Sequence, residues 1–281
     1  QRLIAGECDI MPYPAPADIA TLQGNDKLVV LEQEGLNIGY MSYNVTEPPF
    51  DNVKVRKALS MAVDKAAIID AVYQGAGQDA KNLIPPTMWS YNDSVPADVY
   101  DPEQAKKLLA EAGVTSLTTD LWAMPVSRPY NPNAQRVAEL IQADWAAIGV
   151  TANIVSYEWT EYRERGKQKD RKGPFQIGWT GDNGDPDNFF ATLFSCAAIG
   201  VSNYSSWCDK DFEDLIQKAK TTSDQAERTA LYEKAQVVFK DQEPALTLAH
   251  SKVFMPMNKK VLNYIMSPLG THNFKDVDVA E

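Results

Sequence analysis

Two loops of this chain carry side chains of opposite charge next to aromatic residues. Arg128 and Tyr130 lie just beyond a predicted strand, and Trp179 and Asp182 lie just beyond a short apolar run. A guanidinium can bind a carboxylate through two parallel hydrogen bonds, and an aspartate can bind an ammonium group. Together the two loops suit a small zwitterion that also has apolar parts.

The loop with Asp182 has the composition of a loop that presents polar groups at fixed angles. Residues 178–187 contain three glycines, one proline and three aspartates. Glycine lets backbone or ligand approach closely, and Trp179 supplies a flat apolar wall. Asp182 and Asp185 could also work as general acid and base in a hydrolase, as in glycoside hydrolysis. Aspartates in such loops more commonly form turns and helix caps.

Other patterns of catalytic or metal-binding residues are missing from the sequence. There is no Gly-x-Ser-x-Gly, Cys-x-x-Cys or His-Glu-x-x-His motif, and residues 182–187 do not follow the calcium-loop pattern. The two histidines, His250 and His272, lie in an apolar strand and a terminal loop, as structural histidines do. Residues 75–80 lack the flanking strand and helix of a dinucleotide site. We therefore expect no metal and no cofactor.

The overall charge excludes further classes of partner. The 281 residues have a formal net charge of −11 and a pI near 4.8, and the positive charges are not gathered in one block. Such a chain is repelled by phosphate backbones and by anionic lipid surfaces. No apolar run approaches the roughly 20 residues of a membrane helix. We expect a soluble protein that does not bind nucleic acid.

The elements that must position the two loops alternate between strands and helices. Strands are predicted at residues 36–45, 119–124, 150–157 and 245–254, and helices at residues 53–73, 101–113, 131–149, 210–220 and 223–242. The charged stretch 158–172 is typical of a solvated helix face and loop. This alternation predicts an α/β or mixed α+β fold.

The three cysteines form an odd set. Cys196 and Cys208 are twelve residues apart across a stretch rich in Gly, Ser and Asn, which favours a local disulfide, with free buried cysteines as the alternative. Cys8 stands alone near the start of the chain. In an oxidising compartment it would need a partner that this chain does not contain.

Several longer motifs resemble those of the periplasmic dipeptide-binding proteins of bacterial ABC importers. The most specific motif is residues 178–190, GWTGDNGDPDNFF, which distinguishes the dipeptide branch from the wider peptide and nickel-binding family. Further matching stretches are residues 6–14, 73–77, 83–89, 121–133, 194–196 and 203–208. The resemblance covers essentially the whole chain.

The resemblance implies a two-lobed periplasmic binding protein fold of type II, of which this chain holds one complete lobe and fragments of the other. Residues 35–253 would form the second ligand-binding lobe. Residues 1–34 would be a fragment of the first lobe, and residues 254–281 would return to it. The N-terminal part of such a protein would be absent here. Cys8 would pair with a cysteine in that absent part, and Cys196 would pair with Cys208.

The resemblance also implies a function without enzymatic activity. Such receptors in the periplasm of Gram-negative bacteria close two lobes on a dipeptide and deliver it to an inner-membrane ABC permease. Asp182 matches the residue that binds the ligand's ammonium group, and Arg128 matches the one that binds its carboxylate. The peptide and its side-chain pockets would be lined by Trp179, Tyr130, Gly178 and Thr180. A receptor for longer peptides, haem or another peptide-like metabolite is the alternative within the family. Without the first lobe, the chain is expected to bind weakly or not at all.

Overall fold

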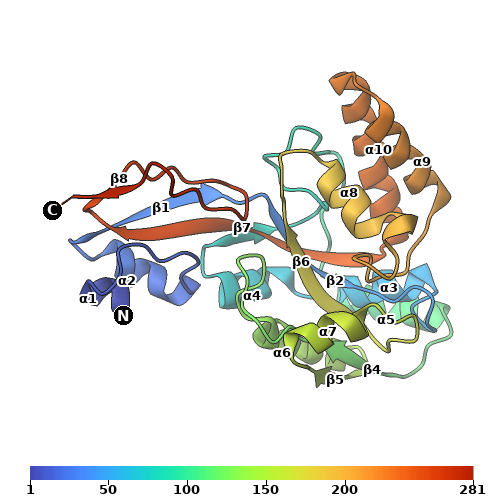
Figure 1. The fold of residues 1–281 in the computed structure, drawn as a ribbon. Coiled ribbons are helices and arrows are strands. Elements are labelled where there is room, and N and C mark those ends of the chain that lie inside the picture. The colour runs from blue at the N-terminus through green and yellow to red at the C-terminus, as the bar shows by residue number, and fades with distance from the viewer. Residues whose placement is uncertain (281) are drawn as a thin grey trace.

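The structure is a computed structural model that describes residues 1–280, and it consists of a slender arm joined to a larger body (Figure 1). Both chain termini lie in the arm. The arm comprises the second half of a long strand, β7, together with α1 (Arg2–Ala5), α2 (Ile19–Gln23), β1 (Leu28–Glu34), β8 (Val261–Leu262) and β9 (Asp278–Val279). A small apolar cluster of Leu3, Leu22 and Leu28 packs inside it.

One seven-stranded sheet runs through both parts, in the order β1-β7-β2-β6-β4-β5, with β3 beside β7. Its other strands are β2 (Asn37–Ser42), β3 (Gly77–Asp79), β4 (Leu117–Trp122), β5 (Val150–Val155), β6 (Phe175–Thr180) and β7 (Ala245–Asn258). β7 pairs with β2 through residues 245–249 and with β1 through residues 252–258. This single strand therefore belongs to both the body and the arm. The β4–β5 and β4–β6 pairs are parallel, and the other pairs are antiparallel.

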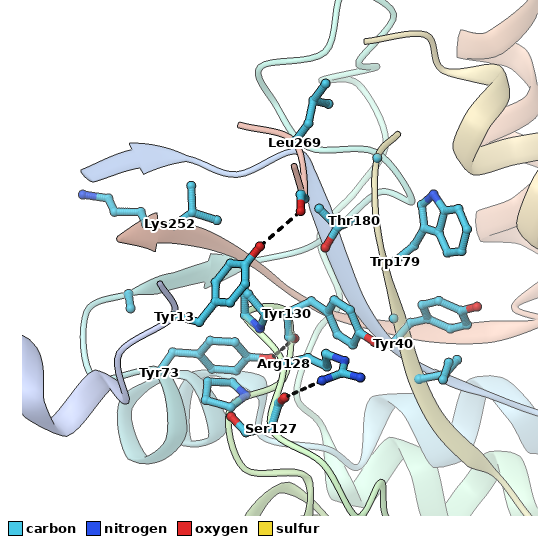
Figure 2. Close-up of a pocket in the computed structure, with 18 of the residues that line it drawn as sticks. Tyr13, Tyr40, Tyr73, Ser127, Arg128, Tyr130, Trp179, Thr180, Lys252 and Leu269 are labelled. Atoms are coloured by element: carbon cyan, nitrogen blue, oxygen red, sulfur yellow. Dashed lines mark hydrogen bonds between the residues drawn. The ribbon is translucent and has the colours of Figure 1, made fainter. Parts of the chain in front are cut away.

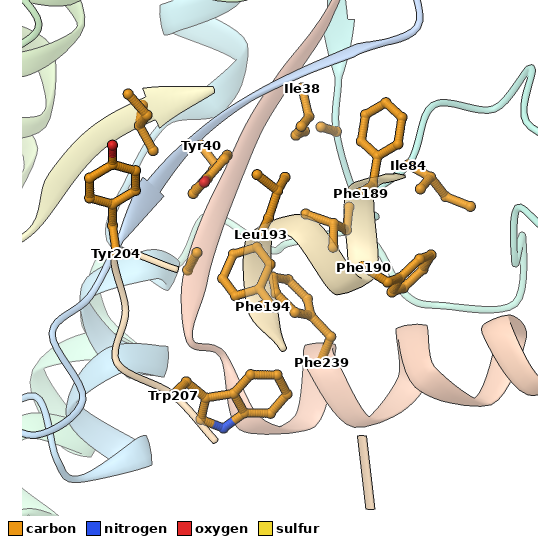
Figure 3. Close-up of a cluster of buried hydrophobic side chains, with 14 of the residues drawn as sticks. Ile38, Tyr40, Ile84, Phe189, Phe190, Leu193, Phe194, Tyr204, Trp207 and Phe239 are labelled. Atoms are coloured by element: carbon orange, nitrogen blue, oxygen red, sulfur yellow. The ribbon is translucent and has the colours of Figure 1, made fainter. Parts of the chain in front are cut away.

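Helices cover both faces of the sheet in the body. They are α3 (Val53–Met61), α4 (Lys65–Ile68), α5 (Pro102–Glu111), α6 (Ala134–Ala147), α7 (Trp159–Gly166), α8 (Asp187–Phe194), α9 (Lys210–Thr221) and α10 (Gln225–Gln242). Successive side chains of a strand point to opposite faces, so the adjacent Tyr40 and Met41 of β2 enter different apolar clusters. Met41 faces α3, α5 and α6, and Tyr40 faces the aromatic cluster built on α8 and α10 (Figure 3). The mixed α/β class predicted from the alternation of elements is confirmed.

The single helix predicted over residues 53–73 is wrong. α3 ends at Met61, and a new helix, α4, begins at Lys65. The break has a local cause, because the side chain of Asp64 accepts a hydrogen bond from the backbone N–H of Ala67 and so caps the second helix. The chain then leaves α4 through a wider helical turn over Ile69–Tyr73.

Two predicted helix starts are also displaced. α6 is capped by Asn133, whose side chain accepts from the N–H of Arg136. Asn131, where the Asn-Pro pair predicted the helix to begin, is instead fully buried and bonds to β6. α10 is capped by Asp224 through the N–H of Glu227, one residue later than predicted. The start predicted at Asp101 is confirmed, with its side chain accepting from Gln104.

The predicted disulfide between Cys196 and Cys208 is present, with the two Cα atoms 4.7 Å apart. It links the end of α8 to the residues just before α9. Cys8 in the arm is half-buried and carries a free thiol. Within residues 1–280 there is no helix that combines the length and apolar character needed to span a membrane.

Candidate ligand-binding site

A cavity of about 770 Å³ lies where the arm meets the body (Figure 2). All the residues predicted to bind ligand line it: Arg128, Tyr130, Gly178, Trp179, Thr180 and Asp182. The arm contributes lining residues that the sequence did not point to, including Tyr13, whose hydroxyl donates to the carbonyl of Gly270 at 3.4 Å. The structure thus gathers the six residues around one space, and their individual roles in binding stay a prediction.

The cavity opens where β6 continues past the end of its neighbour β4. The two strands pair only through Trp122 and Phe175, so the following residues of β6 have no strand beside them on that edge. The N–H of Gly181 donates to the carbonyl of Leu36 on the opposite edge. Because main-chain groups alternate between the two edges of a strand, those of Gly178 and Thr180 point to the open edge. The cavity is therefore bordered by backbone donors and acceptors that have no backbone partner within residues 1–280.

Arg128 forms the positive end of this cavity. Its guanidinium carbon lies 5.3 Å from the ring centroid of Trp159, and one guanidinium nitrogen donates to the carbonyl of Ser127 at 3.2 Å. The loop is held by two backbone hydrogen bonds between Arg128 and Asn131, of 3.1 and 3.0 Å. Within residues 1–280 no carboxylate lies at ion-pair distance from Arg128. Its charge is available to an anionic group of a ligand.

Tyr130 packs against two glycines that pair with each other in the sheet, Gly39 of β2 and Gly178 of β6. A Cβ atom at Gly178 would lie 2.2 Å from the Tyr130 ring, and one at Gly39 would lie 2.2 Å from the Tyr130 carbonyl oxygen. The hydroxyl of Tyr73 donates to that same carbonyl at 2.7 Å. Burial raises the pKa of Tyr130 to about 12, and the nearby Arg128 opposes this shift, so the phenol is neutral at physiological pH.

Gly178 was predicted to line the peptide, which stays a prediction, and the structure shows that its lack of a side chain makes room for Tyr130. Gly39 and Tyr73 were not predicted at all. No local signal marks them, because their importance comes from the register between β2 and β6 and from the packing of a distant turn.

Asp182 forms the negative end of the cavity. Its exposed side chain is oriented by Asn188, in the first turn of α8. The side-chain oxygen of Asn188 accepts from the N–H of Asp182 and from the indole of Trp179, both at 2.9 Å, and its amide nitrogen donates to the Asp182 carboxylate at 3.1 Å. One side chain therefore fixes both Asp182 and the indole of Trp179. Sequence reasoning missed this role, although Asn188 lies within the quoted 178–190 motif.

The loop that contains Asp182 is also held by contacts with residues outside the cavity. Arg228 of α10 donates to the carboxylate of Asp185 at 2.8 Å, and its guanidinium lies 5.2 Å from the ring centroid of Trp89. The indole of Trp89 donates to the carbonyl of Gly184 at 3.2 Å. Asp185 is thus engaged in holding the loop and does not share the cavity with Asp182. This overturns the acid–base pair on which the hydrolase hypothesis depended.

The remaining polar lining was not predicted from sequence. Tyr40 is fully buried and its hydroxyl has no hydrogen-bond partner within residues 1–280. Trp159 and Arg163 reach the cavity from α7, which was expected to be only a solvated surface helix. In the part of the chain that the structure describes, no cluster of three or more His, Cys, Asp or Glu side chains is arranged to hold a metal ion.

Comparisons with known proteins agree with this architecture. Residues 1–200 match the family model of bacterial extracellular solute-binding proteins, family 5 Middle. A dipeptide-binding protein of Escherichia coli (strain K12) is 60% identical over 280 residues, which cover 99% of this chain and 52% of that protein. Heme-binding protein A of Haemophilus influenzae is 49% identical over 279 residues, covering 99% of this chain and 51% of that protein.

Solved structures share the fold over the whole chain. A dipeptide-binding protein from Pseudoalteromonas sp. SM9913, in complex with Met-Leu, superposes with a TM-score of 0.92 at 38% identity and covers 99% of this chain and 55% of that one. The fold is thus the mixed α/β fold of periplasmic binding proteins, and the chain spans about half the length of the curated relatives it matches. These findings show that the chain belongs to the family 5 bacterial extracellular solute-binding proteins, which are binding proteins rather than enzymes.

Proposed function

We propose that this chain carries the two terminal anchors of a dipeptide receptor that serves an ABC importer. The observation that supports this most directly is a pair of opposite charges, Arg128 and Asp182, that line one cavity without ion-pair partners within residues 1–280. A zwitterionic ligand compensates both charges at once. Asp182 binds its ammonium group and Arg128 binds its carboxylate.

The main chain of the peptide is recognised by the open edge of β6. Gly178 and Thr180 direct their backbone groups to this edge, so an extended ligand pairs with them as an added strand does. Backbone hydrogen bonds give affinity without reading the ligand's side chains. This explains how one site accepts many sequences, with Trp179 and Tyr130 as apolar walls for the side chains.

The distance between the anchors selects the length of the ligand. A third residue moves one terminus away from its anchor and leaves a desolvated charge without a partner, which costs several kcal/mol. Side chains are held less strictly, because the cavity of about 770 Å³ leaves room for bridging water. The receptor is therefore selective for length and tolerant of composition.

We propose the domain organisation implied by the resemblance. Residues 35–253 form the second lobe, and residues 1–34 and 254–281 belong to a first lobe whose larger part lies in an N-terminal segment outside this chain. The relatives are about twice as long, which supports this division. The first lobe closes the cavity, and Cys8 forms a disulfide with it. The complete receptor is periplasmic and delivers its ligand to an inner-membrane permease.

Calorimetry on the complete protein tests the terminal anchors. We expect Ala-Phe, Met-Leu and other unrelated dipeptides to bind, and N-acetyl-Ala-Phe to bind at least about 100-fold more weakly, because an ionic hydrogen bond to Asp182 is lost. Asp182→Asn should weaken Ala-Phe and leave N-acetyl-Ala-Phe nearly unchanged. Equal affinity for the free and acetylated peptides would rule out Asp182 as the ammonium anchor.

The alternative is a receptor for longer peptides, haem or a related metabolite. Two observations favour keeping it: one relative is named a heme-binding protein, and the cavity exceeds the volume of a small dipeptide. A panel containing dipeptides, tripeptides, tetrapeptides and haem separates the two functions. Haem or tetrapeptide binding with no measurable dipeptide binding would replace our proposal.

A further inference from the structure

We propose that Arg163 is a specificity-determining residue that favours dipeptides with an acidic C-terminal side chain. This inference rests on the proposed dipeptide function and goes beyond it by naming a preferred class of ligand. It follows from the placement of Arg163 in the cavity wall, from the lack of an acidic partner for it, and from the balance of charges around the cavity.

Arg163 reaches the cavity from α7, one helical turn after Trp159. Residues four apart lie on the same face of a helix, so the two side chains are neighbours. The guanidinium carbon of Arg163 lies 5.9 Å from the ring centroid of Trp159, and that of Arg128 lies 5.3 Å from the same ring. Two guanidinium groups therefore flank one indole at the carboxylate end of the cavity.

The acidic residues at the start of α7 and within it form hydrogen bonds or ion pairs with groups other than Arg163. Glu158 caps the helix by accepting from the N–H groups of Thr160 and Glu161. Glu161 pairs with Arg165, and Glu164 pairs with Lys167. No ion pair within residues 1–280 includes Arg163. The Arg163 guanidinium thus lies beside the aromatic surface of Trp159 without forming an ion pair in the described residues.

The charge balance around the cavity points to the ligand. Within residues 1–280 its charged lining consists of Arg128, Arg163, Lys252 and Asp182, and Lys252 already pairs with Glu32 at 3.3 Å. Two positive charges and one negative charge remain. A neutral dipeptide compensates one of each and leaves one guanidinium without a partner. A C-terminal Asp or Glu brings a second carboxylate, separated from the first by only a few bonds, and compensates all three charges.

An alternative explanation is that Arg163 only stacks on Trp159 and stabilises the helix. A purely structural role would affect all ligands alike. A charge that faces the ligand instead discriminates between ligands of equal shape. Arg163 lines the same cavity as Arg128 and Asp182, so its charge is placed to act on the ligand.

The test compares isosteric ligands in the complete protein by calorimetry. Ala-Glu and Ala-Gln differ in charge and hardly in shape. We expect Ala-Glu to bind about three- to tenfold more tightly, in line with a partly exposed ion pair, and the ratio to decrease as salt is added. Arg163→Gln should bring the ratio close to one, because it removes the charge that distinguishes the two ligands. Arg163→Glu should reverse the preference, so that Ala-Lys binds more tightly than Ala-Gln.

Two controls make the result specific. Arg165→Gln changes an arginine on the same helix that pairs with Glu161, and it should leave the Ala-Glu to Ala-Gln ratio unchanged. Glu-Ala carries its extra negative charge at the ammonium end of the ligand. It should therefore bind no more tightly than the neutral Gln-Ala. Equal binding of Ala-Glu and Ala-Gln to the unmodified protein, or a preference that survives in Arg163→Gln, would overturn the inference while leaving dipeptide binding intact. Failure of every dipeptide, Ala-Ala included, would instead remove the proposed function itself.

Discussion

The two charged ends of the cavity are built in different ways. At the positive end, Tyr130 is buried against paired glycines of β2 and β6, and the neighbouring Asn131 is fully buried and donates to Gln176 of β6 at 3.0 Å. At the negative end, Asp182 is exposed, and the side chain that orients it, Asn188, lies only six residues away. The positive end is therefore part of the core, whereas the negative end is a loop held mainly by its own sequence.

This difference separates affinity from stability. A change at the positive end disturbs core packing and should reduce the free energy of unfolding together with ligand affinity. A change at the negative end should weaken recognition of the ligand's ammonium group while the fold keeps most of its stability. All four predictions below concern the protein at its full natural length, and they test this contrast in order of decreasing effect.

Gly178→Ala should have the largest effect. The new Cβ would lie 2.2 Å from the Tyr130 ring and 2.4 Å from the backbone oxygen of Ile38, which cannot move aside without breaking the pairing of β2 with β6. We expect the free energy of unfolding to fall by about 1–3 kcal/mol, as for an overpacked core, and dipeptide affinity to fall with it. Chemical denaturation and calorimetry measure the two quantities.

Gly184→Ala is the matched control, because a Cβ there has no atom within 4 Å. It makes the same chemical change in the loop of the negative end and should leave stability within about 0.5 kcal/mol. If the two alanine variants were equally stable, the close packing of Tyr130 against Gly178 would not contribute to stability as proposed.

Asn188→Ala should come second. It removes the hydrogen bonds that fix Asp182 and Trp179, so we expect dipeptide affinity to fall about tenfold, equivalent to roughly 1.4 kcal/mol. Stability should fall by less than the affinity does. Binding of an N-acetylated dipeptide, which has no ammonium group, serves as the internal control. An equal loss for both ligands would show that Asn188 supports the cavity generally rather than through Asp182.

Tyr73→Phe should have a smaller effect, and on stability rather than specificity. The substitution keeps the ring and removes only the hydroxyl that donates to the buried carbonyl of Tyr130. We expect a loss of about 1 kcal/mol in the free energy of unfolding. Tyr100→Phe, at an exposed ring, is the control and should cost nothing measurable. Thermal denaturation of both variants measures the difference. A Tyr73→Phe variant as stable as the control would show that this hydrogen bond does not stabilise the packing around Tyr130.

Arg228→Gln should have the smallest effect. It breaks the ion pair with Asp185 and the cation–π contact with Trp89, and none of these three residues lines the cavity. Since partly exposed ion pairs contribute little, we expect a loss in dipeptide affinity of about threefold or less. Arg136→Gln, which breaks a surface pair on α6, is the control. A loss larger than that of Asn188→Ala would mean that the negative end depends on α10 as strongly as the positive end depends on the core.

Helix ends show how far local sequence can be trusted. The cap at Asp101 was predicted correctly, because Asp followed by Pro satisfies the first turn wherever the helix is placed. Asn131 was mistaken for a cap for the same local reason, since Asn followed by Pro looks equally suitable. Its side chain instead donates a hydrogen bond to Gln176, which is distant in the sequence. The prediction of one continuous helix over residues 53–73 was wrong. The apolar residues keep a helical spacing throughout this range, and that spacing does not reveal that Asp64 caps a new helix.

The sequence by itself determined the features that depend on neighbouring residues. These are the mixed α/β class, the disulfide between Cys196 and Cys208, and the presence of an acidic side chain near Trp179 in a glycine-rich loop. Only the tertiary structure decided that β4 ends where β6 continues, that Gly39 and Gly178 meet under Tyr130, and that Arg163 forms no ion pair in the described part of the chain. Strand order and register bring together residues that are far apart in the chain, and no local pattern encodes which ones meet.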